Sequence, residues 1–133
     1  MANKNMLEIV LARAERSKQD KTKILNLKTE TLGDITVIVP PFRKLTDWID
    51  EVSDMGENAS TWDITLANAE LVFDCTPLLK DNFAQLSEAY EEKEPPMLTV
   101  KIFEAANAIG ELNDIATRIT SSIGADKLAI KNS

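Results

Sequence analysis

The fold is decided by residues 77–123, whose sequence is PLLKDNFAQLSEAYEEKEPPMLTVKIFEAANAIGELNDIATRITSSI. This stretch ends in the longest amphipathic pattern of the chain. Its apolar residues recur at steps of four and three, at Leu98, Ile102, Ala105, Ile109, Leu112, Ala116, Ile119 and Ile123. Such spacing is typical of a helix face that packs against another helix. Because Pro96 fits the first turn of a helix, we predict one long helix that continues to Ile123.

Small residues make part of this predicted helix locally flat. Gly110 lies inside the pattern, where glycine costs about 1 kcal/mol relative to alanine. Four alanines lie close to it, at Ala105, Ala106, Ala108 and Ala116. Two interpretations follow. The helix packs closely on its own domain, which we favour, or its flat face is a docking surface for a partner helix.

The N-terminal part of the chain predicts a helix followed by a hairpin. Residues 6–14 place Leu7, Val10, Leu11 and Ala14 on one helical face. Such a short helix is unstable alone, so we expect it to dock on another surface. Alternating and β-branched runs predict strands at 22–29 and 34–39, and prolines end the second strand. Because a lone hairpin is marginal in water, one face should lie on the helices or an edge should pair with another chain.

Three further helices are predicted in the middle of the chain. The first covers 45–55, and its row of acidic residues is interpreted as a solvated face rather than a cation site. The second begins at Ser60 or Thr61 with a capping box and runs to Asp74. The third is short, capped by Asp81, and contains Phe83, Leu86 and Tyr90. We expect Trp62 and Phe73, which flank the apolar stripe of the second helix, to be core residues.

These elements predict a mainly α (α+β) fold. We expect a compact bundle of about five helices with a small N-terminal β-hairpin at about 22–39. A single domain would cover residues 1–123, and residues 124–133 would form a flexible tail after Gly124.

The composition argues against several functional classes. The 133 residues carry a net charge of −7, whereas nucleic-acid binders present basic surfaces. No apolar run approaches the length that crosses a bilayer, and no secretory leader is visible. We therefore expect no nucleic-acid or membrane partner and a cytoplasmic location.

The residue types also argue against catalysis. The chain has no histidine and a single cysteine, Cys75, which we expect to pack as a small hydrophobe. An internal disulfide, a cysteine-rich zinc site and a histidine-based triad are thereby excluded. No phosphate-binding loop or nucleophile motif is present. We therefore predict an interaction protein, with no enzymatic activity, no cofactor and no metal site.

The order of elements and several strings resemble the phage tail assembly chaperones of the XkdN-like type, from prophages of Gram-positive bacteria. The resemblance covers most of the chain. It rests on the strand ending in IVPPF, the early Trp48, the CTPLLKD string and, above all, AIGELNDIATRITSSIG after an acidic connector with Pro95 and Pro96.

The resemblance implies a non-structural assembly factor that is absent from the mature virion. Such proteins bind the tape measure protein and keep this long helical client soluble while the tail tube forms. The major tail protein is a second expected partner. A longer frameshifted product is a further implication. A homo-oligomer is a separate alternative that the sequence leaves open. We expect client binding on the last helix, through Ile102, Ile109, Leu112, Ile119 and Ile123. The same residues would be selected if this helix were core.

Two rival functions remain open from the sequence. One is a small acidic adaptor or inhibitor that acts by binding a host or phage protein. The other is an enzyme that uses only carboxylates and hydroxyls, which a deep pocket with convergent Asp or Glu side chains would favour.

Overall fold

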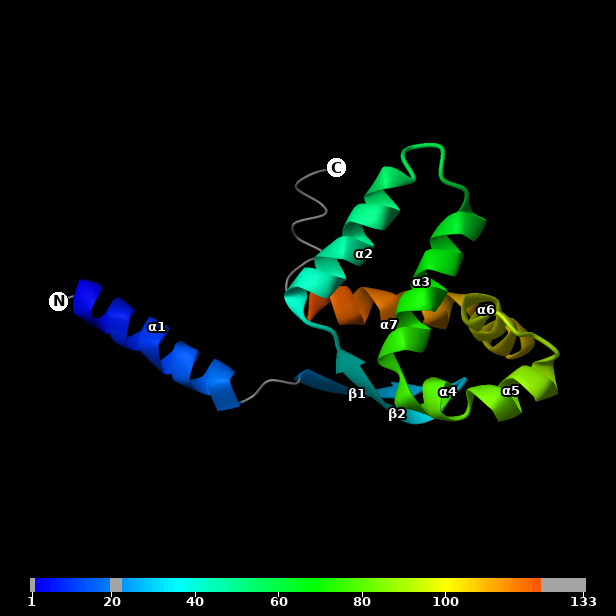
Figure 1. The fold of residues 1–133 in the computed structure, drawn as a ribbon, viewed down its shortest axis with the longest axis horizontal. Helices are drawn as coiled ribbons and strands as arrows, with labels where there is room; N and C mark the ends of the chain where they lie inside the picture. Colours follow the sequence, from blue (N-terminus) through cyan, green and yellow to red (C-terminus); the bar gives the residue numbers. More distant parts are fainter. Residues whose placement is uncertain (1, 20–22, 123–133) are drawn as a thin grey trace.

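A computed structural model describes residues 2–19 and 23–122 and shows a mainly helical chain (Figure 1). The predicted α+β class is confirmed: within the described residues, seven helices accompany a two-stranded antiparallel hairpin. The elements are α1 (Ala2–Gln19), β1 (Lys23–Thr29), β2 (Gly33–Val39), α2 (Phe42–Asp54), α3 (Thr61–Cys75), α4 (Pro77–Asp81), α5 (Phe83–Tyr90), α6 (Pro95–Ala105) and α7 (Ile109–Ser121).

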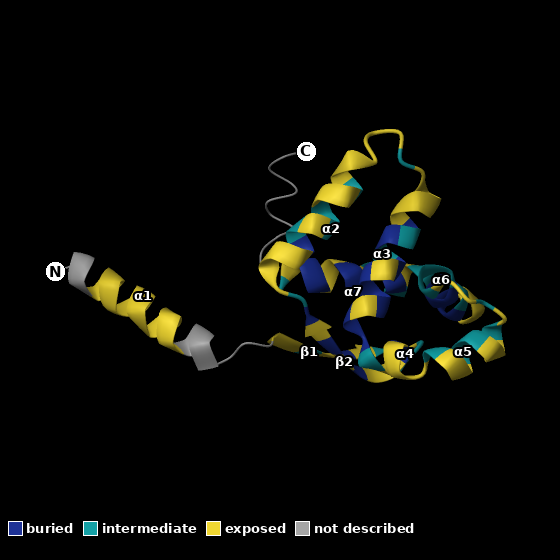
Figure 2. Ribbon diagram, in the orientation of Figure 1, coloured by how far each residue is buried: buried dark blue, intermediate teal, exposed yellow. Residues whose placement is uncertain are grey.

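Helix α3 lies at the centre of the fold. It packs against α6 and α7, while α2 lies beside it and α4 continues from its end (Figure 1). The core between these helices is dominated by fully buried side chains such as Val72, Leu98, Phe103, Leu112 and Ile119. Figure 2 shows this buried layer running through α3, α6 and α7. Burial of these apolar side chains is the main favourable term that holds the helices together.

The hairpin closes one end of this core. Its register pairs Lys23 with Val39 and Thr29 with Gly33. Successive residues of a strand point to opposite faces, and alternate residues of β2, at Ile35, Val37 and Val39, are buried. The prediction that one face lies on the helices is therefore confirmed. Gly33 adopts a φ of 73° at the end of the turn, a conformation that glycine reaches without a Cβ penalty.

The ends of α2 and α3 follow from local chemistry. Pro40 and Pro41 stop β2, and the Pro41 carbonyl accepts the first helical hydrogen bond of α2 from Leu45. At α3, Ser60 accepts a hydrogen bond from the backbone N–H of Asp63, whose side chain accepts one from the Ser60 backbone. The predicted capping box is thus present.

The prediction of one long helix after Pro96 is wrong, because the structure has two helices there, α6 and α7. Asn107 adopts a left-handed φ of 55°, which asparagine tolerates better than most residues. The N–H of Ala108 donates to the Phe103 carbonyl, and that of Asn107 donates to Glu104. These are the two hydrogen bonds of a Schellman motif, which ends α6. Helix α7 then starts afresh at Ile109.

Other details of the helical prediction also need correction. The cap of α5 is Asn82, whereas Asp81 ends α4. Of the two aromatic residues expected in the core, Phe73 is buried and packs edge-to-face on Phe83 with ring centroids 5.7 Å apart. Trp62 is 47% exposed, because it lies in the first turn of α3, beyond the helices that cover the rest of that helix.

Helix α1 is longer than predicted and does not dock on the domain. It stands away from the remaining elements in Figure 1. The side chains described on it, those of residues 5–15, are all exposed (Figure 2). The expectation that this helix docks on another surface is therefore not met within this chain.

The C-terminal tail predicted for 124–133, and the tip of the predicted last helix at Ile123, lie outside the described residues. Within the described part, no helix combines the length and the apolar character that a bilayer crossing requires.

Candidate functional site: an apolar groove with an acidic rim

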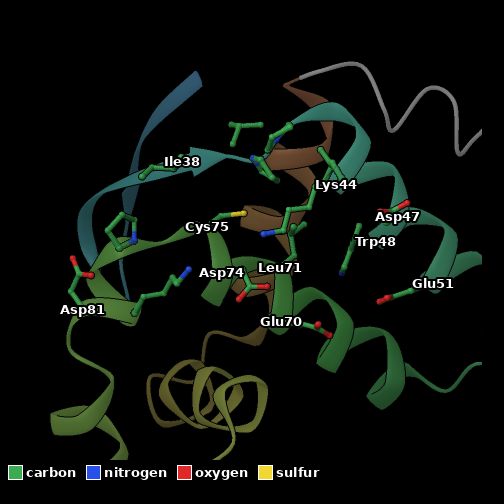
Figure 3. Close-up of a pocket in the computed structure, with 16 residues that line it drawn as sticks. Ile38, Lys44, Asp47, Trp48, Glu51, Glu70, Leu71, Asp74, Cys75 and Asp81 are labelled. Atoms are coloured by element: carbon green, nitrogen blue, oxygen red, sulfur yellow. The ribbon is translucent and has the colours of Figure 1, made fainter. Parts of the chain in front are cut away.

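A groove of about 790 Å³ opens between α2, α3, α4 and the end of β2 (Figure 3). We call it the α2–α3 groove. Its floor is apolar and consists mainly of Val39, Pro41, Leu45, Trp48, Leu71 and Cys75. The volume lies within the range of binding pockets, and apolar lining with a few polar groups is typical of them.

The local sequence explains why this groove forms. Pro40 and Pro41 turn the chain sharply from β2 into α2, so that α2 leaves the hairpin and runs beside α3. Trp48 holds the two helices at this separation, because its indole N–H donates to the Ala67 carbonyl at 2.9 Å. Its ring lines the groove and is half-buried.

The rim of the groove is predominantly acidic. Five carboxylates lie on it, from Asp47, Glu51, Glu70, Asp74 and Asp81, against the ammonium groups of Lys44 and Lys80. Figure 3 shows Glu51 on α2 and Glu70 and Asp74 on α3, on the facing helices of the groove. The expectation that the acidic residues of α2 form a solvated face is confirmed for Asp47 and Glu51, which are exposed.

The negative charge of this rim affects the pKa of Glu70. Partial burial raises the pKa of its carboxyl group, and the negative charges of Glu51 and Asp74 raise it further. A cationic group brought to this position would relieve that repulsion. The rim is therefore suited to a basic ligand.

Cys75 lies deep in the groove, and its thiol is unreactive. It is buried, as predicted, with only 4% of its surface exposed. Burial raises the pKa of its thiol to about 11, and the nearby Asp74 charge adds to this shift. Because the thiolate is the reactive form, Cys75 is a floor residue of the groove rather than a nucleophile.

The carboxylates of the groove do not form a metal site. Among residues 2–19 and 23–122, no group of three or more His, Cys, Asp or Glu side chains is placed to hold a metal ion. The acidic groups lie on an open rim above an apolar floor, instead of meeting at one point in a closed cavity. This geometry favours contact with an extended apolar and basic surface.

The residues predicted to bind a client lie elsewhere. Ile102, Leu112 and Ile119 are buried in the core, and Ile109 is half-buried against it. Ile123 lies outside the described residues. The structure therefore supports the alternative interpretation, in which these positions are core. Our prediction that they form an exposed binding face is corrected. The apolar steps of four and three reflect the packing of α6 and α7 on α3.

Gly110 does not lie against another element of the described fold. A Cβ added at Gly110 would meet no atom within 4 Å, so this glycine does not allow a close approach. The favoured interpretation, that this helix packs closely on its own domain, is confirmed for α7, which contacts α3 and buries Leu112 and Ile119, although Gly110 itself makes no close contact.

A second apolar surface lies on α1. Leu7, Val10 and Leu11 share its apolar face and are each more than half exposed, and Ile9 is similarly exposed on another face of the helix. Sequence reasoning identified the apolar face of this helix but not its exposure. The groove was missed altogether, and its only signal was the pair Pro40 and Pro41 followed by Trp48.

Comparison of the chain with protein-family models, with curated proteins and with solved structures gives no match.

Proposed function

We propose that this chain is an assembly chaperone that binds a helical segment of another polypeptide in the α2–α3 groove. The observation that carries the proposal is the groove itself, which joins an apolar floor to an acidic rim. An amphipathic helix buries its apolar stripe in such a groove and places basic residues over the rim. The proposal makes the protein a binding module without catalytic activity.

The resemblance to phage tail assembly chaperones supplies the identity of the client. On that basis the client is the tape measure protein, and the chaperone works in the cytoplasm of the host cell. A long helical protein exposes apolar stripes before it is enclosed, and such stripes promote aggregation. The net charge of −7 would keep the complex soluble.

Ile38 offers a direct test of the groove. Its side chain lines the groove and is 41% exposed, so a polar replacement there leaves the core intact. The test is co-expression of the chain with the tape measure protein of the same tail gene cluster. Soluble tape measure protein that co-purifies with the chain is then measured. We expect Ile38→Asp to lose most of this material.

Ile64→Asp is the matched control. Ile64 is also 41% exposed, but it lies on α3 outside the groove. This variant should retain the client. Equal loss in both variants would reject the groove as the binding site. Failure of the unaltered chain to bind the tape measure protein would instead favour an adaptor or inhibitor with a different partner.

A further inference from the structure

We infer that α1 is an exchanged arm, which docks in the α2–α3 groove of a second copy of this chain. The inference rests on the groove being a helix-binding site, as proposed above, but it does not depend on the identity of the client protein. It concerns two surfaces that the structure leaves uncovered: the apolar face of α1 and the apolar floor of the groove.

Helix α1 has an amphipathic pattern that suits it to a groove. Leu7, Val10 and Leu11 are 55–59% exposed and recur at helical spacing, so they form one continuous stripe. An 18-residue helix with such a stripe gains stability mainly by packing it against another surface. The groove offers an apolar floor that includes Trp48 and Leu71.

The net charges of α1 and the groove rim are opposite in sign. The α1 sequence contains four basic and two acidic residues, a net charge of +2, within a chain whose total is −7. The groove rim has five carboxylates and two lysines, a net charge of −3. Arg13 lies one turn from Val10 and therefore flanks the apolar stripe. Once the stripe is seated, this cation approaches the rim, where Glu70 lies near Glu51 and Asp74.

The length of the connector after α1 favours the groove of a second copy over the chain's own groove. Only residues 20–22 connect α1 to β1, and a connector this short favours exchange between molecules over folding back. Helix α1 extends away from the other elements in Figure 1, which leaves its apolar face accessible to a second molecule. Two arms and two grooves then satisfy each other in a closed, two-fold symmetric dimer.

The exchanged arm would cover the groove until a client helix replaces it. A covered groove would limit aggregation of the free chaperone, because exposed apolar patches promote association. Arm and client would compete, so the dimer would open as the client binds.

The test uses the full chain and its two tryptophans. Trp62→Phe removes the exposed tryptophan of α3 and leaves Trp48, in the groove, as the only tryptophan, which is excited selectively at wavelengths longer than those that Tyr90 absorbs. Mass is measured by light scattering across a range of concentrations, and Trp48 emission is followed in the same samples. We expect a dimer whose Trp48 emission shifts to shorter wavelengths as the dimer forms.

Two variants on α1 make the test specific. Leu11→Asp alters the apolar stripe. Ile9→Asp alters a side chain of similar exposure, which lies about 100° or more around the helix axis from the centre of that stripe. Neither residue touches the core. We expect Leu11→Asp to raise the dimer dissociation constant by about tenfold or more and to reverse the Trp48 shift. Ile9→Asp should behave nearly as the parent chain.

Each other outcome overturns the inference. A monomer whose Trp48 emission responds to Leu11→Asp would place the arm in its own groove. A dimer that needs Leu11 but leaves Trp48 unchanged would mean that the arms pair with each other. If neither mass nor emission responds, α1 has no role in the groove. Because client binding is measured separately through Ile38→Asp, loss of the arm proposal leaves the chaperone proposal standing.

Discussion

Glu111, on α7, accepts a hydrogen bond from the backbone N–H of Thr31 at 2.9 Å, although the two residues lie 80 positions apart. The other oxygen of the same carboxylate accepts a hydrogen bond from the N–H of Glu30 at 2.8 Å. One side chain of the last helix therefore satisfies two backbone donors in the hairpin turn. Because these donors belong to a turn, the strand ladder leaves them without a partner of their own. Glu111 fixes the hairpin to α7.

This arrangement predicts a pH-dependent stability. Burial alone would raise the pKa of Glu111, but the hydrogen bonds from Glu30 and Thr31 outweigh it and lower the pKa. A carboxyl whose folded-state pKa is lowered stabilises the fold above its unfolded pKa, near 4.3 for Glu, and loses that contribution as pH falls through the folded pKa. We expect Glu111→Gln to lower the free energy of unfolding by about 1–2 kcal/mol at pH 7. The difference should shrink below about pH 4.

Urea denaturation at pH 7 and pH 3.5 measures this effect. Glu104→Gln, at an exposed position on α6, is the control for loss of one negative charge. An equal loss in Glu104→Gln, or a Glu111→Gln deficit that persists unchanged at pH 3.5, would contradict the role given to the carboxylate.

The left-handed residue between α6 and α7 gives a second prediction. A residue with a Cβ costs about 1–2 kcal/mol in the left-handed helical region, and asparagine reduces that cost through its short polar side chain. Asn107 has a φ of 55°. Asn107→Ala should therefore destabilise the protein by about 1 kcal/mol, whereas Asn107→Gly should be neutral or stabilising. Thermal unfolding followed by circular dichroism compares them. If alanine is tolerated as well as glycine, the chain continues as one helix through this position.

The same break shows what the sequence could and could not predict. Local signals placed the hairpin, the capping box at Ser60 and the end of the second predicted helix near Asp74, because each depends on neighbouring residues. The break at Asn107 left no trace in the apolar pattern. Helix α7 restarts with its apolar side packed into the same core as α6, so the steps of four and three continue across the interruption.

The groove was beyond prediction for a different reason. It is formed by β2, α2, α3 and α4, whose relative positions are set by tertiary packing rather than by any local pattern. Trp48 illustrates this point: its spacing from Leu45 and Val52 predicts a helix face, but nothing in the sequence indicates that its N–H reaches Ala67. The face of α1 was recognisable as apolar, yet its exposure is a property of the folded chain.

Gly110 supplies a third prediction. It lies in the first turn of α7 with a right-handed backbone, and an added Cβ would meet nothing within 4 Å. Gly110→Ala should therefore raise the free energy of unfolding by about 0.5–1 kcal/mol, mainly because it reduces the entropy of the unfolded chain.

Gly33→Ala is the contrasting variant. A Cβ there would also meet no neighbour, but Gly33 has a φ of 73°, so alanine would be strained. Chemical denaturation of both variants should give opposite signs. If Gly110→Ala destabilises the protein instead, α7 does not begin at Ile109 as described.

Glu70 provides the last prediction, opposite in sign to that for Glu111. Partial burial and the charges of Glu51 and Asp74 raise the pKa of Glu70. A carboxyl with a raised folded-state pKa contributes fully below its unfolded pKa, and that contribution is lost as pH rises through the folded pKa. Glu70 therefore weakens the fold at neutral pH. Since its side chain is exposed and screened by solvent, Glu70→Gln should gain only a few tenths of a kcal/mol at pH 7.

The gain should disappear below about pH 4, where Glu70 is protonated in both states. Urea denaturation at pH 7 and pH 3.5 measures this gain, and Glu88→Gln, on the exposed side of α5, is the control.

In the dimer assay, Glu70→Gln should weaken association, because the groove rim would lose part of the negative charge that faces Arg13 of the arm. A carboxylate that weakens its own fold and strengthens a contact between molecules is expected of a binding rim. If Glu70→Gln lowers stability at pH 7, Glu70 has a stabilising partner within the chain instead, and the acidic rim is not poised for a basic ligand.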